Sequence, residues 1–311
     1  MDDQGAIERE ARWAQARDYL EPRSALPSSP RELKQFLQRH GLHARKGMGQ
    51  HFLIDHDILA RIVQAADLEP ADTVIEVGPG LGILTRELAQ RAGRVVAVEL
   101  DPALIAALRD AQGGLPKVEI VQADIIKFDH VAYLGGQPYK VVANLPYYIT
   151  SPTLRHFLEA SVKPSALVVL VQKEVAERIA ARPGEMSLLA VSIQFYGDPT
   201  LVGFVPASAF FPPPQVDSAI LRIDVYDQPV ADIDPELFFK VVSAGFSQPR
   251  KQLHNALQRG MWLPPGGALR ALREAGIQEK RRAETLDVDE WAALCRTMIG
   301  LGYLKPGRTA E

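Results

Sequence analysis

Short runs rich in valine and isoleucine alternate with helical patterns from residue 58 onward, and this alternation limits the possible folds more than any other feature. Five of the runs predict strands, at residues 73–77, 94–100, 118–124, 139–144 and 166–171. They are apolar at nearly every position, which is typical of strands covered on both faces. Helical segments lie between them, as parallel strands require. The sequence therefore predicts an α/β fold with a parallel sheet between layers of helices.

The end of this pattern indicates how the chain divides into domains. Two further strands are expected at 200–205 and 219–226, and the link FFPPPQ between them is too short for a crossover helix. One of the pair is therefore expected to be antiparallel, in a seven-stranded, mostly parallel sheet. A polar linker follows, and beyond it only helical patterns remain. We expect an N-terminal extension at 1–28, an α/β domain at 29–228 and an all-helical C-terminal domain at 236–311.

Basic residues are concentrated in two segments, although the net charge of the chain is only −3. Residues 31–51 carry five lysines and arginines against one acidic residue, and residues 240–284 carry nine against three. Two basic segments in an otherwise acidic chain are typical of proteins that bind a polyanion such as nucleic acid. Two solvated helix faces would give the same pattern, so charge alone leaves both interpretations open.

The sequence has no feature of a disulfide-stabilised, metal-binding or membrane-spanning protein. Cys295 is the single cysteine, which excludes an intrachain disulfide and a cysteine-based metal cluster. The longest apolar run, residues 166–171, is far shorter than the roughly 20 residues of a membrane span. The first residues lack the apolar segment of a secretory signal. We therefore expect a cytoplasmic protein that binds no metal and no membrane.

A glycine-rich turn, GPGLG, begins at Gly78 directly after the first strand and leads into a helix. Glycines such as Gly78 and Gly80 let the backbone approach a ligand at the carboxyl end of a parallel strand. Glu99 closes the second strand, where its carboxylate can accept the hydroxyls of a ribose. Asp124 closes the third strand, where it can accept a hydrogen bond from an adenine amine. Together these residues predict a site for an adenosine-containing cofactor.

The spacing of the glycines distinguishes between known classes of nucleotide site. Dinucleotide sites usually have the spacing G-x-G-x-x-G, and P-loops require G-K-[ST], which is absent here. The spacing in this chain is G-x-G-x-G, with Glu76 two residues before the first glycine. That form suits the S-adenosylmethionine (SAM) site of class I methyltransferases, whose fold is Rossmann-like. A set of ordinary tight turns remains the alternative.

The fourth strand ends in Asn144-Leu145-Pro146-Tyr147, the most specific motif of the chain. An exocyclic adenine amine is a poor nucleophile because its lone pair is delocalised into the ring. Two acceptors facing its two protons favour a tetrahedral nitrogen whose lone pair can be directed at a methyl group. The Asn144 side-chain oxygen and the Pro146 carbonyl are candidate acceptors, and Tyr147 offers a face on which a flipped base can stack. Taken alone, a plain strand-ending turn would give the same four residues.

Taken in order, these motifs resemble the ribosomal RNA adenine N6,N6-dimethyltransferase family, specifically its bacterial KsgA-type small-subunit branch. The resemblance rests on ARKGMGQHFL (44–53), IEVGPGLGILT (75–85), VEL (98–100), QADI (122–125), NLPYYI (144–149), FFPPPQVDSAI (210–220) and FSQPRKQLHNAL (246–257). It implies a class I SAM-dependent methyltransferase domain followed by a helical domain. It also implies dimethylation of two adjacent adenosines in the 3′-terminal hairpin of small-subunit (16S) rRNA, within the assembling 30S subunit.

The same resemblance assigns roles to individual residues of the first domain. Carried over position by position, the SAM contacts of the family fall on His51, Leu53, Gly78, Glu99, Asp124 and Asn144. The family usually has asparagine in place of His51, so a backbone contact would survive here and a contact through the side-chain amide would not. Phe210 begins a loop that lies near the target base in the wider family. It is therefore a candidate second wall of the base slot, with a buried loop aromatic as the alternative.

The helical domain is expected to hold the RNA. The apolar residues of 250–258 share one face of a predicted helix, and Arg250, Lys251 and His254 lie on the other face, available to phosphate. The resemblance implies that this domain helps to bind the rRNA. The protein is expected to act as a monomer.

Three other functions compete with this one. The antibiotic-resistance methyltransferases of large-subunit rRNA share overlapping motifs, but the stretch VPASAF and the basic C-terminal domain favour the small-subunit enzymes. A non-catalytic RNA-binding assembly factor with the same fold is disfavoured because Gly78, Glu99, Asp124 and Asn144 are all present. A nicotinamide-dependent dehydrogenase would need residues for hydride chemistry, and the sequence has none that we can assign.

Overall fold

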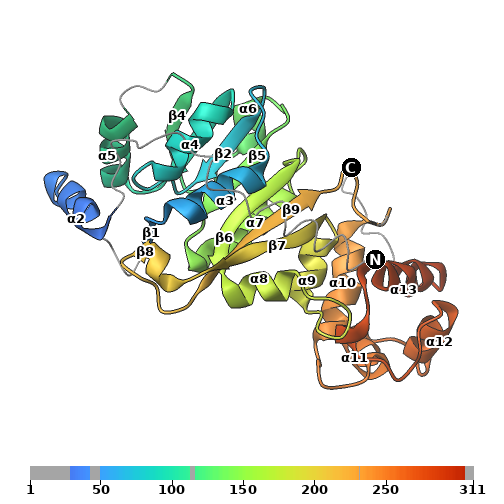
Figure 1. Ribbon diagram of the computed structural model, residues 1–311. Helices are drawn as coiled ribbons and strands as arrows, with labels where there is room; N and C mark the ends of the chain where they lie inside the picture. The colour runs from blue at the N-terminus through green and yellow to red at the C-terminus, as the bar shows by residue number, and fades with distance from the viewer. Residues whose placement is uncertain (1–28, 43–49, 113–115, 231, 305–311) are drawn as a thin grey trace. The chain divides into compact units, whose positions relative to one another are not determined.

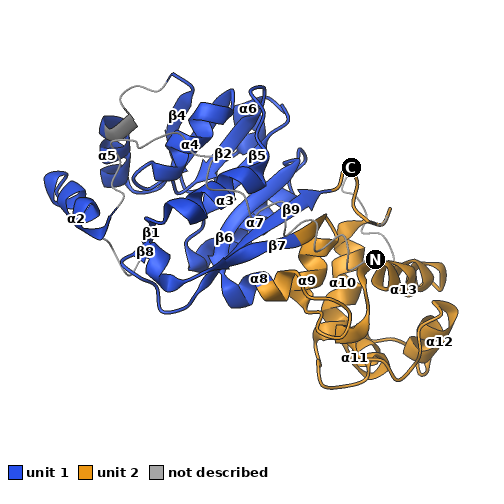
Figure 2. Ribbon diagram, in the orientation of Figure 1, with its two compact units in different colours: residues 1–176, 200–225 blue, residues 177–199, 226–311 orange. Residues whose placement is uncertain are grey.

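The computed structural model describes residues 29–42, 50–112, 116–230 and 232–304, and Figure 1 shows the course of the chain. The extension expected at 1–28 lies outside the described residues. Contacts divide the chain into two compact units (Figure 2). Unit 1 contains residues 1–176 and 200–225, and unit 2 contains residues 177–199 and 226–311.

Unit 1 is built on a seven-stranded sheet with the strand order β4-β3-β2-β5-β6-β9-β7. The strands are β2 (Thr73–Val77), β3 (Arg94–Glu99), β4 (Val118–Gln122), β5 (Lys140–Asn144), β6 (Ala166–Gln172), β7 (Gly197–Val205) and β9 (Ser218–Val225). Neighbouring strands from β4 to β6 run parallel, whereas β9 pairs with β6 antiparallel. The predicted α/β fold with a mostly parallel, seven-stranded sheet is confirmed.

Helices precede and connect the strands of unit 1. They are α2 (Pro30–Arg39), α3 (His56–Ala66), α4 (Ile83–Arg91), α5 (Pro102–Gln112), α6 (His130–Leu134), α7 (Thr150–Leu158) and α8 (Lys173–Ile179). Ile62 of α3 and Leu88 of α4 are fully buried in a core that also takes in Val74, Val95 and Val142 of the central strands. This burial supplies the main stabilisation of the layers, because each buried aliphatic side chain contributes roughly 1.5–3 kcal/mol.

A second, two-stranded sheet joins segments that are far apart in the sequence. β1 (Phe52–Leu53) pairs antiparallel with β8 (Phe210–Phe211), with Phe52 opposite Phe211 and Leu53 opposite Phe210. Local sequence patterns do not predict this sheet, because two-residue strands have no periodicity. The pairing holds the segment that leads into α3 beside the loop that precedes β9.

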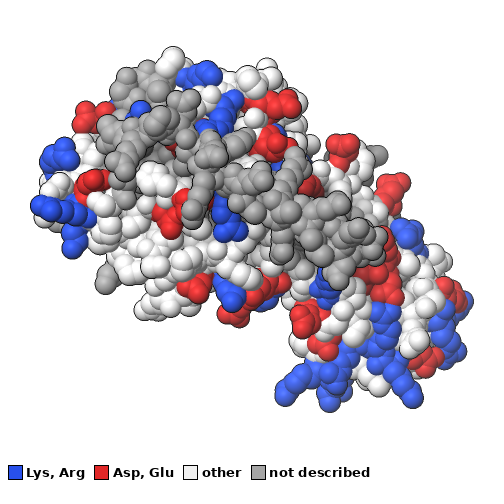
Figure 3. All heavy atoms as spheres, in the orientation of Figure 1, with Lys and Arg blue, Asp and Glu red and all other residues white. Residues whose placement is uncertain are grey.

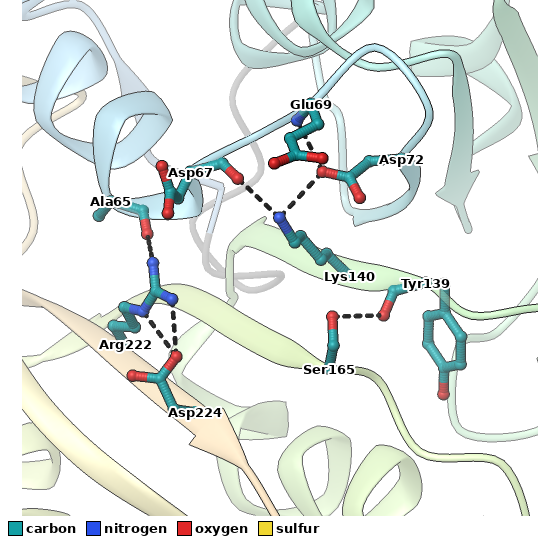
Figure 4. A network of polar contacts seen from close by, with 9 residues as sticks. All are labelled: Ala65, Asp67, Glu69, Asp72, Tyr139, Lys140, Ser165, Arg222 and Asp224. Carbon is teal, nitrogen blue, oxygen red and sulfur yellow. Dashed lines mark hydrogen bonds and ion pairs between the residues drawn. The ribbon is translucent and has the colours of Figure 1, made fainter.

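A polar network ties α3 to the sheet at the amino-terminal end of β5 (Figure 4). The Lys140 ammonium donates to the backbone carbonyl of Asp67 at 2.6 Å and pairs with the carboxylate of Asp72 at 2.9 Å. From β9, Arg222 donates to the carbonyl of Ala65 and pairs with Asp224. The last carbonyls of α3 are thereby satisfied by side chains rather than by water.

Unit 2 is helical in its C-terminal part, as predicted. Its helices are α9 (Leu188–Gln194), α10 (Pro235–Phe246), α11 (Leu253–Gly260), α12 (Gly267–Glu274) and α13 (Val288–Gly300). Trp291 of α13 is fully buried, and Gly245 of α10 makes room for it, since a Cβ atom there would lie 2.3 Å from the indole. Within the described ranges, no helix is long and apolar enough to cross a membrane.

The boundary between the units differs from the domain boundary expected from the sequence. Residues 177–199 fall within the α/β domain expected at 29–228, but they pack with the C-terminal helices. Phe195, which follows α9, stacks on Phe238 of α10 with ring centroids 4.3 Å apart. A contact between side chains so far apart along the chain leaves no signal in local sequence patterns.

Candidate active site

A cavity of about 510 Å³ opens at the carboxyl ends of β2, β3, β4 and β5. Open α/β sheets bind their ligands at this edge, and the volume suits a small organic ligand. The cavity is lined by His51, Leu53, Gly78, Gly80, Glu99, Asp124, Asn144, Pro146 and Tyr147, among other residues. The residues predicted to bind the cofactor and, with the exception of Phe210, those predicted to bind the base therefore lie around one cavity.

The glycine-rich turn forms one wall of the cavity. Gly78 and Gly80 have φ angles of 65° and 57°, in the left-handed region that favours glycine. A side chain at Gly80 would also come within 3.3 Å of the Phe52 ring. The turn ends at Gly82, after which α4 begins. Glycine is thus required here both by backbone conformation and by the close approach of β1.

The Glu99 carboxylate is held in place by backbone donors at the end of β3. Its Oε1 atom accepts the N–H groups of Leu100 at 2.8 Å and Asp101 at 2.9 Å, and Oε2 accepts that of Gly80 at 3.3 Å. Burial raises the pKa of Glu99, and these three donors oppose that rise. Asp124, after β4, accepts the N–H of Ile126 through Oδ1 at 3.1 Å. Both carboxyls keep lone pairs with which they can accept from a ligand.

Glu76 is a cavity residue that the sequence analysis noted only as part of the glycine motif. It lies on β2 with 1% of its surface exposed, and its pKa is raised to about 8, mainly by burial and in smaller part by the charge of Glu99. Its position two residues before the first glycine was the signal that could have identified it. Side-chain accessibility cannot be read from that position, because strand residues point to alternate faces of the sheet.

The electrostatics of the cavity favour a cationic ligand. Four carboxyl groups line it, those of Glu76, Glu99, Asp101 and Asp124, and its described lining contains no lysine or arginine. A dinucleotide with an anionic pyrophosphate would be repelled here, whereas a positively charged ligand would be attracted. This charge pattern argues against the nicotinamide-dependent alternative.

The Asn144 side chain is oriented by the backbone of His51. Its Nδ2 atom donates to the His51 carbonyl oxygen at 3.0 Å. That bond fixes which end of the amide is the donor, so Oδ1 is left as an acceptor at the cavity. The Pro146 carbonyl already accepts the N–H of Ile149 at 3.1 Å, which leaves it one lone pair for a ligand. The two predicted acceptors therefore both retain accepting capacity.

Tyr147 and His51 form an aromatic pair at the cavity. The Tyr147 hydroxyl is hydrogen-bonded to the Ser218 hydroxyl at 2.8 Å, and the two rings stack with centroids 6.0 Å apart and an interplanar angle of 23°. His51 Nδ1 donates to the carbonyl of Pro212 at 2.7 Å. The side chain of His51 thus braces the loop after β8, while its backbone carbonyl positions Asn144.

Phe210 lies in the hydrophobic core and not at the cavity. It is only 3% exposed and belongs to the hydrophobic core together with Leu53, Ile58 and Leu84. It is absent from the cavity lining. The physical reason is its pairing with Leu53 in the β1–β8 sheet, which turns the ring into the core. In this structure Phe210 is a core residue rather than a wall of the base slot.

The predicted RNA-binding residues lie around the start of α11 in unit 2. The helix begins at Leu253 rather than at Lys251, so Arg250 and Lys251 belong to the exposed loop before it. His254 is half-buried, and its Nδ1 atom is engaged by the carbonyl of Glu279 at 3.1 Å. The two loop cations are thus free to meet solvent, whereas His254 has a structural contact.

Comparison with known proteins gives a consistent result. The family model described as ribosomal RNA adenine dimethylase matches residues 41–299. Proteins named ribosomal RNA small subunit methyltransferase A are 50% identical in Dehalococcoides mccartyi, over 89% of this chain and 96% of theirs, and 42% identical in Moorella thermoacetica, over 87% and 98%.

Two solved structures share the fold. A dimethyladenosine transferase from Plasmodium falciparum is 25% identical, with a TM-score of 0.73 over 81% of this chain and 98% of that one. The 23S rRNA methyltransferase ErmE is 30% identical, with a TM-score of 0.65 over 80% and 99%. The resemblance inferred from the motifs is confirmed, and the chain belongs to the ribosomal RNA adenine dimethylase family.

Proposed function

We propose that the protein uses SAM to dimethylate the exocyclic N6 of two adjacent adenosines in the 3′-terminal hairpin of small-subunit rRNA. It acts as a monomer on rRNA of the assembling 30S subunit in the cytoplasm. Relatives named small subunit methyltransferases are 50% and 42% identical in the two examples above, whereas ErmE, a 23S rRNA enzyme, is 30% identical. This difference favours the small-subunit substrate over the large-subunit one.

The geometry around Asn144 carries the proposal. Its amide nitrogen is occupied by the His51 carbonyl, so its oxygen remains an acceptor, and the residue lines the same cavity as Glu99 and Asp124. One cavity can then hold the methyl donor on its acidic side and a flipped adenine on the side of the NLPY turn. Such placement converts a bimolecular encounter into an oriented reaction, which is a large part of enzymatic rate enhancement.

SAM fits the donor set of the cavity. When bound, it supplies an electrophilic methyl group on a positively charged sulfur. The four carboxyl groups match its net positive charge. In this proposal Glu99 accepts the ribose hydroxyls and Asp124 the adenine amine, and the glycines of the turn let the backbone come close to the ligand.

The NLPY turn is suited to activate the target amine. Asn144 Oδ1 and the Pro146 carbonyl accept its two protons, which localises the nitrogen lone pair for attack on the methyl carbon. Tyr147, fixed by its bond to Ser218, provides the stacking face. No strong base is needed, because the amine becomes acidic only as the methyl transfers. The proton is then lost to water.

The basic loop of unit 2 is proposed to bind the RNA backbone. The α12 arginines are paired with glutamates, Arg270 with Glu274 and Arg273 with Glu279. In the part of the chain that the structure describes, Arg250 and Lys251 make no such pair. Figure 3 shows Lys and Arg side chains gathered over the region of α11 and its preceding loop. Unpaired cations of this kind contact phosphates without reading sequence.

The decisive experiment offers the protein labelled SAM together with under-methylated small subunits, and large subunits in parallel. We expect label in the small-subunit rRNA only, mapped to two adjacent adenosines as N6,N6-dimethyladenosine. Label in the large-subunit rRNA would identify the antibiotic-resistance activity instead. Absence of label, with rRNA binding retained, would identify a non-catalytic assembly factor.

A further inference from the structure

Glu76 is the most deeply buried of the four cavity carboxyl groups, and its local environment is unlike that of Glu99. Among the described residues its Oε2 atom has no hydrogen-bond partner. Glu99, in contrast, accepts three backbone N–H groups. A buried carboxyl with so few donors is far more stable protonated than ionised unless a cation lies beside it.

Within the described ranges, the groups that face Glu76 do not supply that cation. On either side of β2, its register partners are Ala97 of β3 and Val142 of β5, which are apolar. The hydroxyl of Thr85 on α4 lowers the pKa of Glu76 by less than burial raises it, and Glu99 contributes a second negative charge. The other titratable side chains that line the cavity are His51, Asp101, Asp124, Tyr147 and Tyr148. Since no described residue of this lining is a lysine or arginine, we look to the ligand for the cation.

The proposed cofactor changes its charge during the reaction. SAM carries a sulfonium and an ammonium against one carboxylate, a net charge of about +1, whereas the thioether product has lost the sulfonium charge. A positive charge within about 4–6 Å favours the ionised form of a carboxyl group. The cavity therefore presents Glu76 with a cation before methyl transfer and with a neutral molecule after it.

Resting on the SAM-dependent activity proposed above, we propose that Glu76 is a proton-linked charge partner of the cofactor. It releases its proton to solvent when SAM occupies the cavity, and it takes one up from solvent when the thioether product replaces SAM. Each turnover returns the side chain to its starting state. The linkage makes the cavity select the charged methyl donor over the spent product, so Glu76 limits product inhibition.

The linkage predicts opposite pH dependences for the two ligands. Because the pKa of Glu76 in the free protein is about 8, SAM must displace a proton from most molecules at neutral pH. SAM affinity should therefore rise with pH, by up to about tenfold per unit, and level off above the pKa. Affinity for S-adenosylhomocysteine should stay flat below the pKa and fall above it.

Calorimetry in two buffers of different ionisation enthalpy tests the proposal. At about pH 7, SAM binding to the wild-type protein should release close to one proton, and S-adenosylhomocysteine should release none. Glu76→Gln should abolish the release on SAM binding and weaken SAM above pH 8, while leaving product affinity within about threefold. The amino group of SAM can also release protons on binding, and the release measured with Glu76→Gln gives that background. Asp101→Asn, a neighbouring cavity carboxyl, should leave the release intact.

Three outcomes separate the possibilities. SAM binding with buffer-independent heat, or equal proton release in Glu76→Gln, would overturn this inference alone. Failure of the wild-type protein to bind SAM would overturn the proposed function. If Glu76→Gln does not fold, an infrared difference spectrum of the wild-type protein decides: loss of a protonated-carboxyl band on adding SAM supports the proposal, and an unchanged band refutes it.

Discussion

Single side chains in the cavity obtain their roles from neighbours that are distant in the sequence. Asn144 would be an ordinary strand-terminal amide without the His51 carbonyl, which lies 93 residues earlier and takes up its donor. Glu99 is kept in position by three backbone N–H groups that surround its carboxylate. Substitutions of these two residues should have different effects, because Asn144 acts on the transition state and Glu99 acts on cofactor binding.

Asn144→Ala should lower the rate of methyl transfer by about 10²–10³, since its acceptor is used mainly in the transition state. SAM affinity should change much less. Single-turnover kinetics and calorimetry on the same preparation measure both quantities, and an unchanged melting temperature serves as the control. Equal losses of rate and of SAM affinity would show that Asn144 only binds the cofactor.

Glu99→Ala should raise the Kd for SAM by about 10- to 100-fold. The substitution removes a charged acceptor for the ribose and leaves the N–H groups of Gly80, Leu100 and Asp101 without their partner. Glu99→Gln, which keeps one acceptor oxygen, should have a smaller effect. Calorimetry that finds wild-type affinity in the alanine variant would dismiss the proposed contact with the ribose.

At the scale of elements, the two ends of the sheet serve different purposes. The carboxyl ends of β2 to β5 carry the cavity, whereas the amino-terminal end of β5 carries the Lys140 network that secures α3 (Figure 4). Lys140 and Asp72 are only 17% and 24% exposed, so their ion pair is shielded from solvent. The network is therefore expected to contribute to stability and not to chemistry.

Lys140→Met should lower the free energy of unfolding by about 1–3 kcal/mol, because it removes the ammonium that donates to the Asp67 carbonyl and pairs with the Asp72 carboxylate. SAM affinity of the folded protein should remain that of the wild type. Urea denaturation measures the first quantity and calorimetry the second. Lys127→Met, at an exposed position, is the matched control. A loss of SAM affinity in Lys140→Met would mean that the network shapes the cavity.

At the scale of the whole molecule, the chain combines an acidic cavity in unit 1 with basic residues in unit 2. The net charge of −3 hides this division. The acidic cavity can attract the cation SAM, and the basic loop can attract RNA phosphates. Both are possible in one protein because the two sets of charges belong to different units. RNA affinity should therefore depend on salt through the basic loop of unit 2.

Arg250→Glu combined with Lys251→Glu should weaken rRNA binding and make it less sensitive to salt. Losing about two phosphate contacts should reduce the slope of log affinity against log salt concentration by roughly 1.5–2. Filter binding across a salt titration measures this slope. Arg182→Glu combined with Arg296→Glu makes the same change of charge at exposed positions of unit 2 outside the basic segment. Equal effects in the two double variants would show that the loop is not part of the RNA-binding surface.

Local patterns of residues are enough to predict the sheet, the glycine turn and the acids that end β3 and β4. The sheet follows from apolar runs that need cover on both faces, and the turn follows from glycines that can adopt positive φ angles. The carboxyl ends of parallel strands necessarily meet at one edge. Glu99, Asp124 and Asn144 can therefore be placed together from their positions in the sequence.

Contacts between distant segments account for what these patterns do not predict. The β1–β8 pairing buries Phe210, and the His51 carbonyl orients Asn144. The packing around β2 leaves one Glu76 oxygen without a hydrogen-bond partner among the residues that the structure describes. Residues 177–199 likewise join the helical unit through Phe195 and Phe238. Each of these depends on which parts of the folded chain touch and how much water they exclude, and neither the periodicity nor the spacing of residues encodes that.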